Sequence, residues 1–491
     1  MSKLVSGRRC LRFLFLLPLL VWAVEKQTLR IACLDFPRSF NPAYATGETA
    51  QAVANKIYQA LYHFDRLGAI RPELVERFSA GGSGREISLT LKRGARFADG
   101  SALTSADVVA TVALLKNPLC EYPYLSDLDF LEEIEADGPL GLRLRLKENF
   151  APWRNYLTFK ILSAAETGKI APEKFRSFVP MGSGPYRLTA VNEPWGFELG
   201  ANPFWPRRLR FARLSYSMLA EPRQAPLKLL SGEVDAVEIQ GDDARTYARS
   251  KRWQESFRLL QYRKFGYTYL VFNLRNPGLD RNLRRLFYNR LLTTRFLDDF
   301  LEGAGEKVSS PFLLFGNEKK PRPFPGLTPP RQQRAFRILS NSESTVRKHL
   351  VLFLCEEMKA RGIELTPVFV EYQTFMQRLK NGDFDLAVSA FLLDMDWNMK
   401  DILSSSGYFN YAGLADARMD AVLDEGMREM DPARRRKIYE RAHDLWRDSL
   451  PLLPLFSLNY TMGVSHRIQV PENRFQVIGS SGDFFYNLQD W

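Results

Sequence analysis

The sequence predicts an α/β protein with a parallel sheet covered by helices, and three observations lead to this prediction. The chain has 491 residues, of which 45% are hydrophobic and 25% charged, a composition typical of a globular protein with two or three domains. Strand-like and helix-like segments alternate between Phe336 and Phe391. After residue 24 no apolar run reaches the length of about 18 residues that a membrane helix needs, so a polytopic membrane protein is excluded.

The N-terminus is predicted to be a secretory signal peptide covering residues 1–23. Basic residues precede an apolar run from Phe13 to Val24 that is too short for a typical membrane helix, and small residues predict cleavage after Ala23. A membrane anchor retained at the N-terminus is the alternative. Cleavage removes four positive charges and no negative ones, which lowers the formal net charge from +12 to +8.

The remaining positive charge and the cysteines exclude some partners. An exported basic protein meets membranes, cell-wall polymers and small solutes, so we expect no nucleic-acid partner and interpret the arginine clusters as solvated faces. Cys33, Cys120 and Cys355 remain after cleavage, and no C-x-x-C pair is present. Because their number is odd, at most one disulfide can form, and we expect none of importance.

The first elements of the mature chain mix strands and helices. Thr28 to Leu34 alternates like a short strand, and prolines then force the chain into extended, turn-rich backbone. Glu48 to Tyr62 has the apolar spacing of a packed helix. Glu86 to Leu91 and Leu142 to Leu146 are predicted strands bounded by glycine turns. Residues 44–184 are therefore expected to form a mixed α and β region.

Two successive βαβ units are predicted in the second half of the chain. Their parallel strands would end at one edge of a sheet and open there onto a ligand crevice. A last long helix is predicted after Asp431-Pro432, stopped by Pro451. The predicted units are a strand at Phe336 to Leu339, a helix at Ser344 to Arg361, a strand at Ile363 to Val370, a helix at Tyr372 to Lys380 and a strand at Phe384 to Phe391.

Local motifs for catalysis, metal binding and cofactor binding are missing from the sequence. The glycines around Ser83 and Ser183 do not complete G-x-S-x-G, and Gly168-Lys169 lacks the leading glycine of a phosphate-binding loop. The four histidines are scattered, and none has a metal partner four residues on. We therefore expect neither an enzyme nor a metal or cofactor site.

The segment from Phe97 to Val108 reads FADGSALTSADV, an Asp-Gly turn followed by a helix start with Thr104 as N-cap and Asp107 completing a capping box. It resembles the signature segment of the bacterial extracellular solute-binding proteins of family 5, the peptide- and nickel-binding receptors of ABC importers. Six further segments resemble the same family in the same order, and the resemblance runs from about residue 28 to 470. They are Gly182 to Tyr186, Ala201 to Trp205, Ser231 to Ala236, Tyr269 to Asn273, Gly382 to Leu386 and Leu450 to Phe456.

The resemblance implies a two-lobed periplasmic-binding-protein type II fold with an additional α/β domain inserted in the first lobe. Members close their two lobes on a ligand like a clamp. Carried over to this chain, lobe one comprises residues 24–43, 185–262 and 458–491, the inserted domain 44–184, and lobe two 263–457. The predicted βαβ units fall within lobe two.

The resemblance also implies where a ligand binds. Asp394 follows the strand that ends at Phe391, and it aligns with the acidic residue that pairs with a peptide's free amino group in the family's oligopeptide receptors. Such a carboxylate is a strong, directional anchor. Asp396 is the alternative, because the family's proline-containing continuation is replaced here by Met395-Asp396-Trp397-Asn398. Phe391 and Trp397 are candidates for aromatic walls, with core packing as the alternative.

Four more residues are candidate ligand contacts. Thr46 and Gly47 align with an extended segment that offers backbone hydrogen bonds to a peptide, although an ordinary interlobe turn would look the same. Tyr267 and Tyr269 could line the crevice, but alternating aromatic residues on a strand also form cores. Nickel and haem ligands occur in the family; with so few histidines, a metal chelate is a minor alternative here.

The resemblance thus implies a monomeric periplasmic receptor that captures a peptide or similar small solute and delivers it to the permease of an ABC importer. An exported sensor or scaffold that kept the fold without transport is the second hypothesis. A hydrolase is the third.

Overall fold

The computed structural model describes residues 27–65, 68–81, 84–291, 295–301, 304–312, 322–328, 330, 332–392, 396, 398–471 and 483–491. The predicted signal peptide lies outside these residues, as do Asp394 and Trp397. Within the described ranges no helix is long and apolar enough to cross a membrane.

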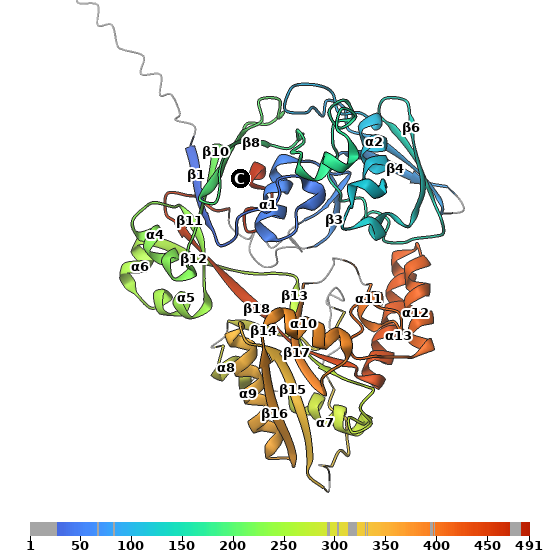
Figure 1. Cartoon of the computed structure of the whole chain (residues 1–491), viewed down its shortest axis with the longest axis vertical. Helices are drawn as coiled ribbons and strands as arrows, with labels where there is room; N and C mark the ends of the chain where they lie inside the picture. The colour runs from blue at the N-terminus through green and yellow to red at the C-terminus, as the bar shows by residue number, and fades with distance from the viewer. Residues whose placement is uncertain are drawn as a thin grey trace, which may run out of the picture.

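The molecule consists of two bodies that share one strand (Figure 1). The sheet order is β16-β15-β17-β13-β18-β11-β1-β10-β9-β8, and β12 and β14 also pair with β18. We call the part containing β1 the upper body and the part containing β15 the lower body, after their places in Figure 1. A separate antiparallel sheet, in the order β4-β5-β7-β6, extends the upper body and is called the small sheet.

The upper body is assembled from chain segments that are far apart in the sequence. β1 is parallel to β10 and β11, and β8, β9 and β10 form antiparallel pairs. The elements of this body are β1 (Gln27–Cys33), α1 (Glu48–Ile57), β8 (Tyr186–Asn192), β9 (Gly196–Ala201), β10 (Phe211–Met218), α4 (Ala225–Leu230), β11 (Ala236–Ile239), α5 (Gly241–Ala248), α6 (Lys251–Ser256) and β12 (Phe257–Arg263).

The small sheet and its helices form a region with a core of its own. Strands β5 and β7 alternate buried leucines and isoleucine with exposed polar residues, so one face packs and the other meets water. The elements here are β2 (Tyr62–Phe64), β3 (Ile70–Pro72), β4 (Val75–Ala80), β5 (Glu86–Leu91), α2 (Ser105–Leu115), β6 (Leu131–Asp137), β7 (Gly141–Leu146) and α3 (Ala164–Thr167).

The lower body contains the two predicted βαβ units, which are confirmed. Strand β15 is parallel to both β16 and β17. β13 lies between β17 and β18 and is buried along its whole length, as expected of a central strand covered on both faces. The elements are β13 (Gly266–Phe272), α7 (Arg281–Leu291), α8 (Arg295–Asp299), β14 (Gly305–Lys307), β15 (Arg334–Asn341), α9 (Thr345–Lys359), β16 (Ile363–Val370), α10 (Tyr372–Asn381), β17 (Leu386–Leu392), α11 (Lys400–Leu403), α12 (Ala417–Arg428), α13 (Pro432–Ser449) and β18 (Leu452–Ser465).

Strand β18 belongs to both bodies. Its first part, Leu452 to Phe456, pairs with β13 of the lower body. Its second part pairs with β11 and β12 of the upper body, up to Ser465. The chain passes between the bodies a second time beside it, where β12 ends at Arg263 and β13 begins at Gly266. The chain thus connects the two bodies twice, through the middle of β18 and through the segment between β12 and β13. We call these two connections together the hinge.

A second contact joins the two bodies away from the hinge. The end of α12 in the lower body meets the small-sheet region: Arg428 Nε lies 2.8 Å from Glu148 Oε2, and the backbone N–H of Ala151 donates to the carbonyl of Met427 at 2.7 Å. The side chain of Met430 packs against the core of the small sheet. The bodies therefore touch on both sides of the space between them.

One sequence prediction needs correction. The helix predicted from Glu48 to Tyr62 ends at Ile57, and Tyr62 begins strand β2. Tyr58 is extended and fully buried, and its hydroxyl donates to the carbonyl of Pro180 at 2.7 Å. Apolar residues continue past the helix end because Ala60 and Leu61 are buried as extended chain, and their spacing is compatible with both structures.

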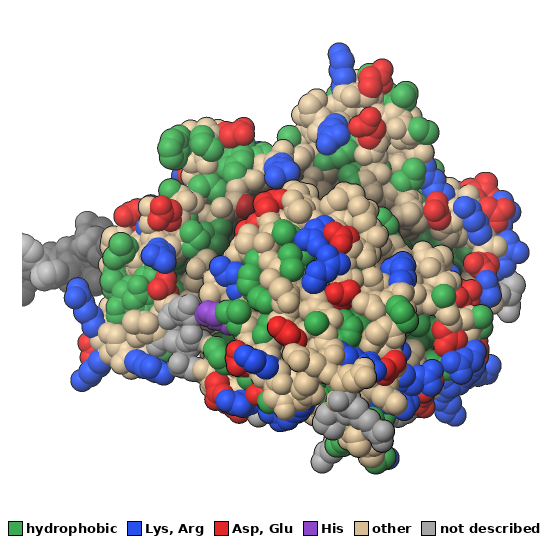
Figure 2. Space-filling view, turned by 60° about the horizontal axis from the view of Figure 1, so that its bottom comes forward, with side chains coloured by type: hydrophobic (Ala, Val, Ile, Leu, Met, Phe, Trp, Pro, Cys, Tyr) green, Lys and Arg blue, Asp and Glu red, His purple; other side chains and the backbone are tan. Residues whose placement is uncertain are grey.

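The charged surface is mixed in sign. Figure 2 shows Lys and Arg side chains interspersed with Asp and Glu over the face that it draws. Many of these charges form exposed ion pairs, for example Arg143 with Asp137 at 3.0 Å. On this face the positive excess does not form one continuous basic field.

The capping box predicted at Thr104 is present, and it makes a first prediction. Asp107 accepts hydrogen bonds from the backbone N–H and the hydroxyl of Thr104 at 2.7 and 3.0 Å, and from the N–H of Ala164 at 2.9 Å. Asp107→Ala leaves these donors unsatisfied, so we expect the free energy of unfolding to fall by about 1–3 kcal/mol in urea denaturation. Glu135→Ala, on an exposed part of β6, is the control and should change it by less than about 0.5 kcal/mol. Equal effects of the two substitutions would contradict this role of Asp107.

Candidate functional site

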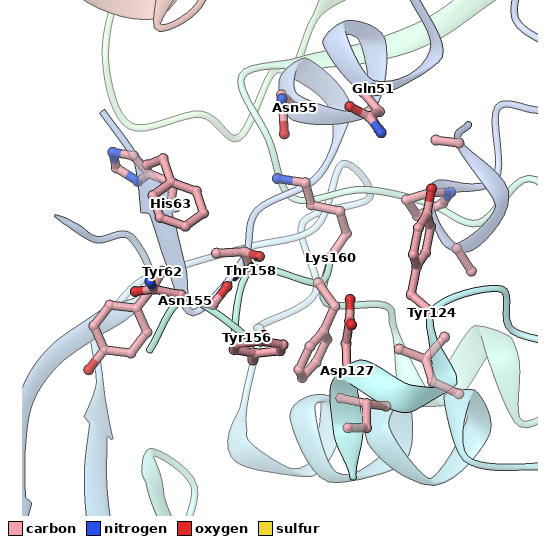
Figure 3. Close-up of a pocket in the computed structure, with 18 of the residues that line it drawn as sticks. Gln51, Asn55, Tyr62, His63, Tyr124, Asp127, Asn155, Tyr156, Thr158 and Lys160 are labelled. Carbon is pink, nitrogen blue, oxygen red and sulfur yellow. Dashed lines mark hydrogen bonds between the residues drawn. The ribbon is translucent and has the colours of Figure 1, made fainter. Parts of the chain in front are cut away.

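A cavity of about 300 Å³ opens between the upper body and the loop that follows β17 of the lower body. Helix α1, strand β2 and the chain segment 155–162 form about half of its wall (Figure 3). From the lower body, Asp396 and Asn398 complete the wall, so the cavity lies at the carboxyl end of a sheet strand, where α/β sheets bind ligands. The polar side chains that line it are Gln51, Asn55, Tyr62, His63, Asp65, Tyr122, Tyr124, Asp127, Asn155, Tyr156, Thr158, Lys160, Asp396, Asn398 and Tyr486.

An aromatic cluster marks the end of β17. The rings of Phe391 and Tyr269 stack with centroids 4.2 Å apart and planes 11° apart, and Tyr267 meets Phe391 edge-on at 6.4 Å. Strand pairing brings these rings together, because Tyr267 lies opposite Phe391 in the ladder between β13 and β17. Only 2% of Tyr267 and 1% of Tyr269 is exposed, whereas Phe391 is half-buried. Phe391 is thus the accessible member of the cluster.

Phe391 continues into a more exposed aromatic edge. Its ring centroid lies 6.0 Å from that of Phe409, which in turn meets Tyr408 at 4.8 Å. Phe409 is 36% exposed and Tyr408 65% exposed. Neither ring is recognisable as a site residue in the sequence, because both lie in an irregular segment and only the folded chain brings them next to Phe391.

The structure pairs Asp396 with an arginine of helix α13. Arg435 donates to both carboxylate oxygens of Asp396, at 2.7 and 2.6 Å, and about a tenth of each side chain is exposed. Arg435 also donates from Nε to the carbonyl of Gly426 at 2.8 Å. A buried bidentate pair of this kind fixes the position of the carboxylate. Asp396 therefore fastens the loop after β17 to α13.

Thr46 and Gly47 lie at the start of α1 and are both exposed. Gly47 has φ of 103°, a left-handed conformation that glycine adopts without strain. They precede Gln51 and Asn55, which line the cavity, but they do not line it themselves. The structure thus places them on the helix that forms one cavity wall, outside the cavity.

Two further basic residues, neither of them a candidate from the sequence, lie at the cavity and near the aromatic cluster. Lys160 lines the cavity. Arg347, in the first turn of α9, lies near Tyr269, Tyr372 and Glu343; burial lowers its pKa, and its guanidinium makes no hydrogen bond or ion pair with any residue that the structure describes. No local pattern distinguishes either residue in the sequence, because only folding brings Lys160 to the cavity and Arg347 to the aromatic cluster.

A buried lysine stabilises the hinge. Lys264 lies between β12 and β13, and its ammonium is 2.6 Å from Glu48 Oε2, 3.6 Å from Glu238 Oε2 and 4.1 Å from the centre of the Tyr460 ring. Burial lowers the pKa of Lys264, but Glu238 and Glu48 outweigh it, so the pKa is raised overall. The cluster ties the start of α1 to the hinge.

The described side chains of the cavity suit binding of a small molecule. Within the described residues no group of three His, Cys, Asp or Glu side chains is placed to hold a metal ion. The cavity combines aromatic and amide groups with one ammonium, which suits hydrogen bonding and charge pairing with a small polar molecule.

Comparison with known proteins identifies the family. Residues 69–313 match the model of the bacterial extracellular solute-binding proteins, family 5 (the middle part), and the chain belongs to this family. The predicted family is therefore confirmed. Its members are non-enzymatic receptors, which places this chain among binding proteins.

Individual relatives match over almost the whole chain. The oligopeptide-binding protein AppA of Bacillus subtilis is 21% identical, covering 94% of this chain and 91% of AppA. The glutathione-binding protein GsiB of Escherichia coli K12 is 22% identical, covering 85% and 86%.

Solved structures confirm the predicted two-lobed α/β fold with its additional domain. AppA of Bacillus subtilis in complex with a nonapeptide superimposes with a TM-score of 0.72 at 20% identity, covering 95% of this chain and 98% of AppA. NikZ of Campylobacter jejuni in complex with Ni(L-His) has a TM-score of 0.77 at 19% identity, covering 95% and 99%.

The hinge cluster generates a second prediction. Lys264→Met removes the ammonium from Glu48 and Glu238. These two carboxylates then repel each other beside Tyr460. Because both carboxylates are partly hydrated, we expect the free energy of unfolding to fall by about 1–3 kcal/mol in urea. Lys251→Met, which disrupts an exposed pair with Glu255, should change it by less than about 0.5 kcal/mol. An unchanged unfolding midpoint for Lys264→Met would refute a stabilising role.

The histidine in the cavity generates a third prediction, on pH dependence. Burial and the nearby Lys160 lower the pKa of His63 from 6.5 to about 4. Between these two values the folded chain binds fewer protons than the unfolded chain, so stability falls as the pH falls from 6.5 toward 4. His63→Gln should lose less stability than the wild type between pH 7 and pH 5, measured as the thermal midpoint at each pH. The exposed His349→Gln is the control, and parallel curves for His63→Gln and wild type would contradict the prediction.

Proposed function

We propose that this protein is a periplasmic receptor that captures a peptide or similar small solute between its two bodies and delivers it to the permease of an ABC importer. The observation that carries the proposal is the position of the cavity. It lies between two bodies joined by a narrow hinge, at the carboxyl end of β17, with walls from both bodies. A solute bound there contacts both bodies and favours the state in which they are closed.

The relatives support a solute built from amino acids. AppA is named for oligopeptides, GsiB for glutathione, and the NikZ structure holds nickel with L-histidine. These solutes share amino and carboxyl groups of amino acids. The cavity volume of about 300 Å³ is at the lower end for small-molecule sites, which suits a short solute or one end of a longer one.

In this proposal Asp394 pairs with the amino group of the solute. Its neighbour Asp396 is already held by Arg435, so Asp394 is the acid of this segment that we assign to the ligand. Phe391, which is partly accessible, and Trp397 form aromatic walls. Tyr267 and Tyr269 support Phe391 from the core side, and Tyr269 does so by direct stacking.

Backbone contacts come from the other body. We assign Thr46 and Gly47 to strand-like hydrogen bonding with an extended ligand, because both are exposed at the start of α1. Lobe one consists of residues 24–43, 185–262 and 458–491, the inserted domain of 44–184, and lobe two of 263–457. These limits are supported by the separate buried cores of the lower body and the small sheet.

The N-terminal segment and the relatives support a periplasmic location in this proposal. Cleavage of residues 1–23 releases a monomer into the periplasm, and one structural relative is named a periplasmic murein tripeptide binding protein. Two others are named as binding proteins of ABC transporters. The importer recognises the closed form and takes over the solute.

Native mass spectrometry of protein purified without denaturation tests the function. We expect a bound species that is released by mild denaturation and that fragments as a peptide or amino-acid derivative. Ligand-free protein that also shows no thermal shift with a peptide library would count against the receptor.

Asp394 supplies the fourth prediction. Asp394→Asn removes the charge that pairs with an ammonium, so binding of peptides with free amino groups should weaken by about 10- to 100-fold, measured by titration calorimetry. N-acetylated versions of the same peptides should bind wild type and variant alike. Asp129→Asn, at an exposed position, is the control. An equal loss for free and acetylated peptides would remove Asp394 from this role.

A further inference from the structure

We propose that Lys160 forms a carboxylate-binding subsite of the cavity, so that the solute carries an acidic group that pairs with this lysine from the upper body. The inference rests on the proposed function, and it adds the chemical class of the ligand to it. It follows from the direction of the side chain, its lack of a partner and the charges around it.

The fold directs Lys160 into the cavity. Its backbone bridges to Ala60, beside the start of β2, and the neighbouring Ile161 is fully buried in the core of the small-sheet region. In extended chain, successive side chains point to opposite sides, so burial of Ile161 turns Lys160 toward the cavity. Figure 3 shows its ammonium extending toward Asn55 of α1.

Lys160 is half-buried and lacks the direct partner that two fully buried lysines have. The ammonium of Lys56 pairs with Asp483, and that of Lys264 pairs with Glu48. Within the described residues, the ammonium of Lys160 makes neither an ion pair nor a hydrogen bond. Burial lowers the pKa of Lys160, and the more distant carboxylate of Glu73 offsets only part of this effect. An ammonium that is partly removed from water and has no direct partner is stabilised by a bound anion.

No other charged group in the described cavity wall pairs with Lys160 or offers a second positive charge to an anion. Asp65 is held by Arg71 at 2.9 Å, and Asp396 is held by Arg435. Burial raises the pKa of Tyr122 and Tyr124, and the nearby Asp127 raises it further. His63, with a pKa of about 4, is neutral at pH 7. Lys160 is therefore the positive charge that the described cavity wall offers to a ligand.

Neutral donors complete the subsite. Asn55 and Gln51 of α1, Asn155 and Thr158 line the same cavity and can donate hydrogen bonds. A carboxylate has two oxygens and accepts several such bonds, so an ammonium flanked by amide and hydroxyl groups suits it.

The test compares acids with their amides. One tripeptide library without Asp or Glu carries free C-terminal carboxylates, a second carries C-terminal amides, and a third carries amides with an internal Glu. A panel of non-peptide carboxylic acids and their amides is added, and retained species are quantified by native mass spectrometry. The variants are Lys160→Met, Lys160→Arg and the exposed control Lys169→Met.

We expect the wild type and Lys169→Met to prefer acids over amides by about 10-fold or more, Lys160→Met to lose that preference, and Lys160→Arg to retain most of it. Retention of the internal-Glu library would identify a side-chain carboxylate as the source, and retention of the first library alone a C-terminal one. Because Lys160 also acts electrostatically on Glu73, Lys160→Met is compared with Lys160→Arg, which keeps this positive charge.

Acid preference that persists in Lys160→Met, or that is lost in Arg347→Met instead, would overturn the assignment. If non-peptide acids bind in a Lys160-dependent way and no peptide binds, the peptide function is refuted and the carboxylate subsite is retained. Failure of every acid in both panels would reject the subsite as well.

Discussion

The architecture depends on one strand that two bodies share. β18 is hydrogen-bonded to the lower body through β13 and to the upper body through β11 and β12, so neither sheet is complete without it. The pairing of β13 with β18 is interrupted between Thr268 and Tyr269, where the register shifts beside Pro454. A bulge bends a strand locally, and proline removes a ladder donor, so β18 is irregular within the lower body, shortly before it enters the upper body. The connection between the bodies is therefore only a few residues wide along each strand.

The charged side chains between the bodies fall into two groups. Lys264 and Asp396 are satisfied within the protein, by Glu48 and Arg435, and they hold the hinge and the loop after β17 in place. Lys160 and Arg347 are half-buried without such partners among the described residues. A receptor needs both kinds of group: paired charges give the site its shape, and unpaired ones provide binding energy that is used when a solute replaces water.

The sequence was sufficient for the elements whose signals are local. The βαβ units, the capping box at Thr104 and the long helix after Asp431 each rest on periodicity and caps within a few residues, and all are present. The helix starting at Glu48 was predicted too long, because the apolar side chains of Tyr58 and Leu61 are buried equally well as extended chain.

The site was less accessible to sequence reasoning because its contacts are distant in the chain. Asp394 and Asp396 could not be told apart until the fold brought Arg435 to one of them, 39 residues further on. Lys160 gained significance only through the cavity wall that it shares with α1. Phe391 could be selected from its place at a strand end, whereas its stacking on Tyr269 required the register between β13 and β17.

The contact between the end of α12 and the small-sheet region gives the molecule a seal opposite its hinge. Arg428, Met427 and Met430 hold the bodies together there by an ion pair, a backbone hydrogen bond and an apolar side chain. Separating the bodies on this side breaks these contacts. None of the three residues lines the cavity, so substitutions at them would change how readily the bodies separate without changing the residues that contact a bound molecule.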